Sequence, residues 1–127
     1  MIFGIGTDIA HVQRFERWVQ TPGMIERFFA PEEFLRSPVQ HKNRVCQHYA
    51  ARFAAKEAFA KALGTGLAFE LKDVCVKKHS TGRPYLSLSA SALQVCQSVC
   101  GSAYSVHLSL SHEKEYAIAV VIIEIIA

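Results

Sequence analysis

The segment from about residue 43 to residue 63 constrains the fold most strongly, because it predicts one long helix. Its apolar residues recur at helical steps of three and four, at Cys46, Tyr49, Phe53, Ala60 and Leu63. Gly64 comes directly after them, and glycine is typical of the end of a helix. The charged pair Lys56-Glu57 stands where the apolar stripe should continue. A buried charge must be paired or must bind something, so this pair is a candidate for function.

The first residues of the chain, 2–9, predict a strand with two unlike faces. One face carries Phe3, Ile5, Thr7 and Ile9, and the other carries Ile2, Gly4, Gly6 and Asp8. Glycines inside a strand mark the close approach of another backbone or of a ligand. Asp8, at the end of this strand, is interpreted either as the cap of a following helix or as a functional carboxylate.

The remaining periodicities and turn residues complete an α+β pattern. We expect a helix over 11–20, short helical turns over 21–41, a hairpin of strands 71–78 and 83–88, a helix over 89–100, and strands over 104–111 and 116–126. The fold class is therefore an antiparallel sheet packed on one long helix, with short N-terminal helices. At 127 residues, the chain is expected to form a single domain over 1–127. The last strand is apolar on both faces over 118–123, which predicts burial against a neighbouring subunit.

Composition excludes several classes of protein. No apolar run reaches the roughly 18–20 residues that span a bilayer, and the N-terminus lacks the pattern of a signal peptide, so we expect a cytoplasmic protein with no membrane partner. The four cysteines form no framework and are expected to be free thiols. Cys96 and Cys100, with His107 and His112, match no standard zinc spacing.

The charges around Lys56-Glu57 suggest phosphate chemistry. Arg52 and Lys56 share one side of the predicted helix, as do Glu57 and Lys61. Cations suit phosphate oxygens, whereas a carboxylate suits a divalent metal. Because Mg²⁺ takes one or two protein carboxylates, Asp8 is the natural second ligand beside Glu57. On this hypothesis the charged pair interrupts the apolar stripe because it faces a metal and a pyrophosphate. Lys56 is interpreted either as a structural partner of the carboxylates or as one that supports them from outside the metal site.

Several motifs, in order along the whole chain, resemble a known family. They are Gly4-Ile5-Gly6-Thr7-Asp8-Ile9 with Arg14, the helix Arg52-Phe53-Ala54-Ala55-Lys56-Glu57-Ala58 with Lys61-Ala62-Leu63-Gly64-Thr65-Gly66, then Gly82-Arg83-Pro84-Tyr85, Leu108-Ser109-Leu110-Ser111-His112 and Tyr116-Ala117. Together they resemble the bacterial holo-(acyl-carrier-protein) synthases, the small trimeric type of phosphopantetheinyl transferase.

The resemblance implies an activity and a set of partners. Coenzyme A would donate its phosphopantetheine arm to a serine of apo acyl carrier protein, in fatty acid and lipid biosynthesis, and adenosine 3′,5′-bisphosphate would be released. Asp8 and Glu57 would hold Mg²⁺, for which Mn²⁺ could substitute, and Lys61 would support the leaving phosphate. The serine proton would go to a metal-bound water or to a free oxygen of Asp8 or Glu57, and the sequence does not choose between them. The resemblance also implies a homotrimer with its sites between subunits.

Further residues receive roles from the same resemblance. The nucleotide part of the site would be lined by Arg52, Gly64, Arg83, Pro84, Ser111 and His112. By strand parity alone, His112 would point inward or lie in a turn; the resemblance instead places it against coenzyme A. Arg14 and Arg17, beside Trp18 on the first helix, would dock acyl carrier protein. The segment 36–44 receives no role.

Two rival functions remain open from the residues alone. A basic nucleic-acid-binding domain could use the cations between residues 14 and 61, but the aromatic residues do not interleave with them, and no nucleic acid is expected. A thioester hydrolase that binds coenzyme A would need no divalent metal, so full activity in EDTA would identify it.

Overall fold

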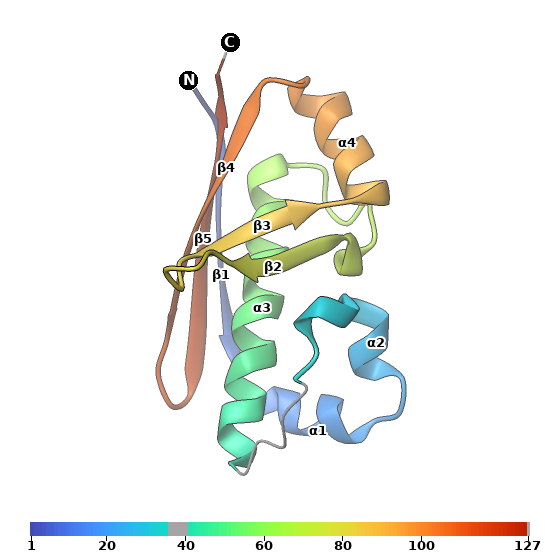
Figure 1. Ribbon diagram of the computed structural model, residues 1–127, viewed down its shortest axis with the longest axis vertical. Helices are drawn as coiled ribbons and strands as arrows, with labels where there is room; N and C mark the ends of the chain where they lie inside the picture. The colour runs from blue at the N-terminus through green and yellow to red at the C-terminus, as the bar shows by residue number, and fades with distance from the viewer. Residues whose placement is uncertain (36–40, 127) are drawn as a thin grey trace.

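The fold is built around one helix that is covered on both sides. The computed structural model describes residues 1–35 and 41–126. Helix α3 (Lys42–Leu63) packs against a three-stranded antiparallel sheet of β1 (Ile2–His11), β5 (Tyr116–Ile125) and β4 (Tyr104–His112), in the order β1-β5-β4. On its other side lies the hairpin of β2 (Val74–Lys78) and β3 (Pro84–Leu88), as Figure 1 shows. The strands therefore form two sheets, whereas we had expected one.

Shorter elements close the ends of this arrangement. Helices α1 (Arg14–Gln20) and α2 (Met24–Phe28) and the turn η1 (Pro31–Glu33) lie near the N-terminal end of α3 (Figure 1). The turn η2 (Leu71–Asp73) leads into β2, and α4 (Ala90–Cys100) joins β3 to β4. The predicted elements are confirmed with shifted ends: β1 runs on to His11, so the first helix begins only at Arg14. No helix in 1–35 or 41–126 is long and apolar enough to cross a membrane.

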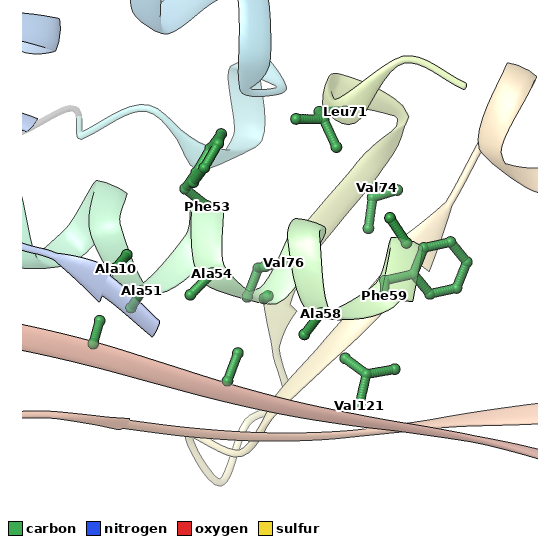
Figure 2. Packing of buried hydrophobic residues seen from close by; sticks show 14 of the residues in the cluster. Ala10, Ala51, Phe53, Ala54, Ala58, Phe59, Leu71, Val74, Val76 and Val121 are labelled. Atoms are coloured by element: carbon green, nitrogen blue, oxygen red, sulfur yellow. The ribbon is translucent and has the colours of Figure 1, made fainter. Parts of the chain in front are cut away.

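Helix α3 uses small residues against one layer and large residues against the other. Ala51, Ala54 and Ala58 face the strands, where Val121 of β5 meets them, while Phe53 and Phe59 point elsewhere into the core (Figure 2). Burial thus extends almost around the helix and is much wider than the single stripe that we predicted. A charged residue on α3 can consequently be buried without facing a ligand.

The glycine face of β1 packs directly on α3. A Cβ atom added at Gly4 would lie 1.9 Å from the carbonyl oxygen of Ala62, and one at Gly6 would lie 2.0 Å from that of Ala58. The two glycines are therefore required by another backbone rather than by a ligand. The opposite, apolar face of β1 is exposed in the single chain, with Ile5 and Ile9 at 66% and 60% exposure.

Candidate functional site

Asp8 is brought to helix α3 by the alternation of β1. It lies on the same strand face as Gly4 and Gly6, and because those glycines allow close contact, its carboxylate reaches the helix surface. Lys61 Nζ donates to Asp8 Oδ1 at 3.0 Å and to the Thr7 carbonyl oxygen at 3.1 Å. The side chains of Lys61 and Asp8 are 55% and 17% exposed, so solvent and ligands can reach this pair.

Glu57 belongs to the same cluster. It precedes Lys61 by one helical turn and is half-buried. Burial raises the pKa of the Glu57 carboxyl, the nearby charge of Asp8 raises it further, and Lys61 and Arg14 oppose the shift. Two carboxylates that repel one another in a partly buried place favour binding of a cation between them.

The carboxylate oxygens of Asp8 and Glu57 fit a hard divalent metal whose other ligands come from water and substrate. Carboxylate oxygens suit Mg²⁺, and two of them leave positions for water and phosphate. Within 1–35 and 41–126, no group of three or more His, Cys, Asp or Glu side chains could form an all-protein metal site. His107 is directed to Glu124 at 3.0 Å rather than to the cysteines.

A second feature is a hollow of about 500 Å³ beside the N-terminal half of α3. Three of the expected nucleotide-binding residues meet there: Arg52, Pro84 and His112. The hollow is also lined by Leu35, Arg44, Gln47, His48, Ala51, Lys78, Gly82 and Leu110. Arg44, Arg52 and Lys78 give it a positive character that suits a phosphorylated ligand. His112 is exposed and lines this hollow, so the inward position inferred from parity alone was wrong.

Arg52 is held in the hollow with unused donor capacity. Its Nη1 donates to the His48 carbonyl oxygen at 3.2 Å. Its Nε is buried and has no hydrogen-bond partner among the described residues. Burial lowers the pKa of Arg52, although a guanidinium stays charged at neutral pH. An oxyanion in the hollow would satisfy the remaining donors.

His48 also lines the hollow, although the sequence had assigned it no role in the site. Its Nε2 lies 2.6 Å from the Glu33 carbonyl oxygen, which requires a proton on this nitrogen. Burial, helped by the charge of Arg52, lowers the pKa of His48 to about 4, so the ring is neutral at pH 7. The spacing of Arg44, His48 and Arg52 at four-residue steps was the signal that could have identified this lining face.

Lys56 has the structural role that was one of its two interpretations, but its partner is Glu33 rather than Asp8 or Glu57. It is fully buried, and its Nζ donates to Glu33 Oε1 at 2.6 Å. The carbonyl oxygens of Leu71 and Val74 accept its other hydrogen bonds, at 3.1 and 2.5 Å. Burial lowers the pKa of Lys56, and the Glu33 carboxylate opposes that shift. The two charged residues of the stripe therefore have different surroundings. Lys56 is buried in the core, and Glu57 lies near Asp8.

The other predicted residues are distributed over two edges of the molecule. Gly64 caps α3 in the left-handed region at φ 81°, one turn beyond Lys61. Ser111 is exposed on β4 beside His112, and Arg83 is exposed at the start of β3. Since β1 and β4 are the two outer strands of the sheet, Asp8 and His112 lie at opposite edges. Residues 36–40 of the unassigned segment 36–44 lie outside the described part of the chain.

The predicted docking residues Arg14 and Arg17 are both exposed on α1. The guanidinium of Arg14 lies over aromatic rings, 5.3 Å from the ring centre of Trp18 and 5.2 Å from that of Phe53. Its charge also acts on Glu57, where it lowers the pKa. Arg14 therefore contacts aromatic rings of α1 and α3 and also lies close enough to the carboxylate cluster for its charge to act on Glu57.

Comparison with known proteins agrees with this geometry. Residues 4–121 match the model of the 4′-phosphopantetheinyl transferase superfamily. A holo-[acyl-carrier-protein] synthase of Treponema denticola is 51% identical over 125 residues, which cover 98% of this chain and 99% of the relative. The crystal structure of a holo-(acyl-carrier-protein) synthase from Bacillus anthracis in complex with CoA (3′,5′-ADP) is 34% identical, covers 99% of both chains and has a TM-score of 0.78. That from Neisseria meningitidis is 35% identical, with a TM-score of 0.82 and coverage of 98% of this chain and 99% of that one.

These matches extend over nearly the full length of both partners in each comparison, and they include the strand of Asp8 and the helix of Glu57. They favour neither the nucleic-acid-binding domain nor the thioester hydrolase that the sequence had left open. The chain belongs to the 4′-phosphopantetheinyl transferase superfamily, and within it to the holo-[acyl-carrier-protein] synthases.

Proposed function

We propose that this enzyme transfers phosphopantetheine from coenzyme A to a serine of apo acyl carrier protein and releases adenosine 3′,5′-bisphosphate. The observation that carries the proposal is the cluster of Asp8, Glu57 and Lys61, two carboxylates and a cation at an accessible edge, in a chain of this family. Such an enzyme would supply fatty acid and lipid biosynthesis, and we expect it in the cytoplasm.

Coenzyme A would place its nucleotide in the hollow beside α3. The unused donors of Arg52 and the exposed ring of His112 would bind phosphate oxygens, and Pro84 would contact the base. Ser111 directly precedes His112, and Arg83 directly precedes Pro84. Gly64 lies at the other end of α3 and would line the nucleotide site only where that site is shared between subunits. A related structure in complex with CoA (3′,5′-ADP) supports coenzyme A as the ligand.

Asp8 and Glu57 would hold Mg²⁺, or Mn²⁺ in its place, against the pyrophosphate. When bound, the ion would act as a Lewis acid that stabilises charge on the phosphate oxygens. Burial and, after it, the charge of Asp8 raise the pKa of Glu57, and a cation between the two carboxylates would offset both effects. Lys61, already anchored by Asp8 Oδ1 and the Thr7 carbonyl oxygen, would carry positive charge to the leaving phosphate.

In the reaction, the serine oxygen forms a bond to the β-phosphorus of coenzyme A, and the bridging bond to the α-phosphate oxygen breaks. The electron pair of that bond leaves with adenosine 3′,5′-bisphosphate, and the serine proton must be accepted. A carboxylate oxygen of Glu57 is a suitable acceptor, because a raised pKa brings it closer to neutral pH. Asp8 is less suited, since Lys61 already donates to its Oδ1.

We further propose that the complete site forms between subunits of a homotrimer. The carboxylate cluster lies at the β1 edge of the sheet and the hollow lies at the β4 edge, so one chain presents two halves that are separated by β5. An interface that joins the β1 edge of one copy to the β4 edge of the next is heterologous, and such an interface gives a trimeric ring when three copies complete one rotation. The exposed residues Ile5, Ile9 and Ile118 would be covered in that ring.

The first experiment is the intact mass of apo acyl carrier protein after incubation with this enzyme, coenzyme A and Mg²⁺, with EDTA in a parallel sample. A gain of about 340 Da, which corresponds to one phosphopantetheine, is expected only without EDTA. The same gain in EDTA would remove the metal assignment, and no gain with several carrier proteins would remove the proposed function.

Mixing two inactive variants tests whether the site is shared. Glu57→Gln removes one half-site and Arg52→Ala removes the other. If the halves come from different subunits, co-refolding equal amounts should restore about a quarter of the wild-type sites, whereas each variant alone stays inactive. Absence of any recovery, with trimers shown by light scattering, would place both halves in one chain.

A further inference from the structure

Four aromatic side chains from three helices form a compact cluster beneath the docking helix α1. They are Phe15, Trp18, Phe28 and Phe53. Trp18 is its centre, because its ring lies within 4.8 to 5.1 Å of the other three ring centres. Phe15 is fully buried, whereas Trp18 is half-buried and borders a surface hollow of about 630 Å³ along α1.

The guanidinium of Arg14 lies over this cluster. Its Cζ is 5.2 Å from the Phe53 ring centre, 5.3 Å from that of Trp18 and 5.6 Å from that of Phe15. All three distances fall within the roughly 6 Å over which a cation is attracted to a ring face. Tryptophan gives the strongest attraction of the three ring types, so Trp18 is the main contact that fixes this cation.

Arg17 provides the contrast on the same helix. It is also exposed and also borders the hollow, but no ring in the described part of the chain lies under its guanidinium. A long side chain without such a contact must lose rotamer freedom when a partner binds it. A cation that is already fixed loses less, and therefore contributes more to the affinity for an acidic surface.

We propose that Trp18 is a positioning residue that holds the Arg14 guanidinium ready for an acidic face of the carrier protein. This inference rests on the proposed function, because it concerns how the acceptor substrate is bound. The occupant follows from charge complementarity: the surface presents Arg14, Arg17 and, over Phe28, Arg27, whose Cζ lies 5.3 Å from that ring centre. Trp18 acts through Arg14 and touches no reacting atom.

Steady-state kinetics separate positioning from a merely structural role. Trp18→Leu should raise the KM for apo acyl carrier protein about fivefold, the factor that corresponds to one cation–π contact of about 1 kcal/mol. The KM for coenzyme A and kcat should change less than about twofold, and Trp18→Phe should recover most of the loss. Phe69→Leu is the matched control, because it removes a ring from a buried aromatic pair that carries no cation.

The coupling between the two residues gives a sharper test. In wild type, Arg14→Ala should raise the carrier protein KM, but in the Trp18→Leu background it should add clearly less than it does alone. Strict additivity of the two substitutions would overturn the proposal. So would equal increases in the KM for both substrates, since these would show a general loss of structure.

Fluorescence tests the contact without any activity measurement. Trp18 is the single tryptophan of the chain, so its emission reports on this place directly. Arg14→Ala should change the intensity or the maximum of that emission, while Arg17→Ala should leave both unchanged. An emission unaffected by Arg14→Ala would overturn the inference even if transfer is observed. If wild type transfers nothing, the proposed function fails, and the emission result still decides whether Trp18 holds Arg14.

Discussion

Two lysine–carboxylate pairs on helix α3 have the same chemistry and opposite surroundings. Lys56 and Glu33 are both fully buried at 2.6 Å, whereas the side chains of Lys61 and Asp8 are 55% and 17% exposed at 3.0 Å. In the buried pair, every strong donor and acceptor is occupied: Glu33 also accepts from the backbone N–H groups of Ala30 and Val76, at 2.9 and 3.1 Å. The open pair has a neighbouring carboxylate, Glu57, and its side chains are accessible to solvent.

The comparison teaches that a charged residue in a core stripe does not by itself indicate a binding site. The buried pair links η1, α3, η2 and β2, so its charges are used in holding elements together. The open pair links only β1 and α3, and its side chains stay partly exposed. Adjacent residues, 56 and 57, can therefore serve stability and chemistry separately.

The largest expected difference between the pairs is in stability. Lys56→Met leaves the Glu33 carboxylate buried without its partner and should lower the free energy of unfolding by about 3–5 kcal/mol. Lys61→Met, the matched change in the open pair, should lower it by less than about 1 kcal/mol. Urea unfolding at one protein concentration measures both, and equal losses would contradict the distinction between the pairs.

Substitutions around the open pair should reduce activity more than they reduce stability. Glu57→Gln should reduce turnover by at least about a hundredfold at saturating Mg²⁺, because even residues that only support metal ligands cost 10–100-fold when they are changed. Its far-ultraviolet circular dichroism and melting temperature should match those of wild type. Near-normal turnover of Glu57→Gln would show that Glu57 does not hold the metal.

The protein should lose stability in acid through His48, which donates to the backbone carbonyl of Glu33 in the buried pair. Because the pKa of His48 is lowered to about 4, the unfolded chain binds its proton first, and stability falls as pH drops from about 6.5 to about 4. In His48→Gln, which can keep a donor for the same carbonyl, melting temperature should fall less over this window. An identical pH profile would place the titration elsewhere.

The smallest expected effect concerns Glu57, beside the open pair. Its contribution to stability changes with pH in the opposite direction to that of His48. The pKa of Glu57 is raised, so its neutral form is favoured by folding, and its contribution to stability is lost as pH rises through that pKa. Since Arg14 lowers this pKa, Arg14→Gln should raise it further. A carboxyl-detected NMR titration without metal measures the shift, and a decrease would contradict the proximity of the two charges.

Much of this architecture could be predicted from local patterns. The long helix, its end at Gly64 and the alternation of β1 are short-range properties, and all three are confirmed. The partner of Lys56 could not be predicted, because Glu33 lies 23 residues away in a short turn that no periodicity connects to the helix. The same applies to His48, whose neutrality depends on burial that only the folded chain creates.

The bare backbone contact between β1 and α3 has a consequence for how the site can vary. With no side chain at Gly4 or Gly6, the spacing between strand and helix is fixed by carbonyl oxygens of Ala58 and Ala62, and no rotamer can adjust it. Asp8 therefore keeps its depth relative to Glu57 whatever happens to the volume of the surrounding core. Substitutions that repack the aromatic side of α3 can accumulate without changing the distance between Asp8 and Glu57, whereas a single methyl group at residue 6 would alter it.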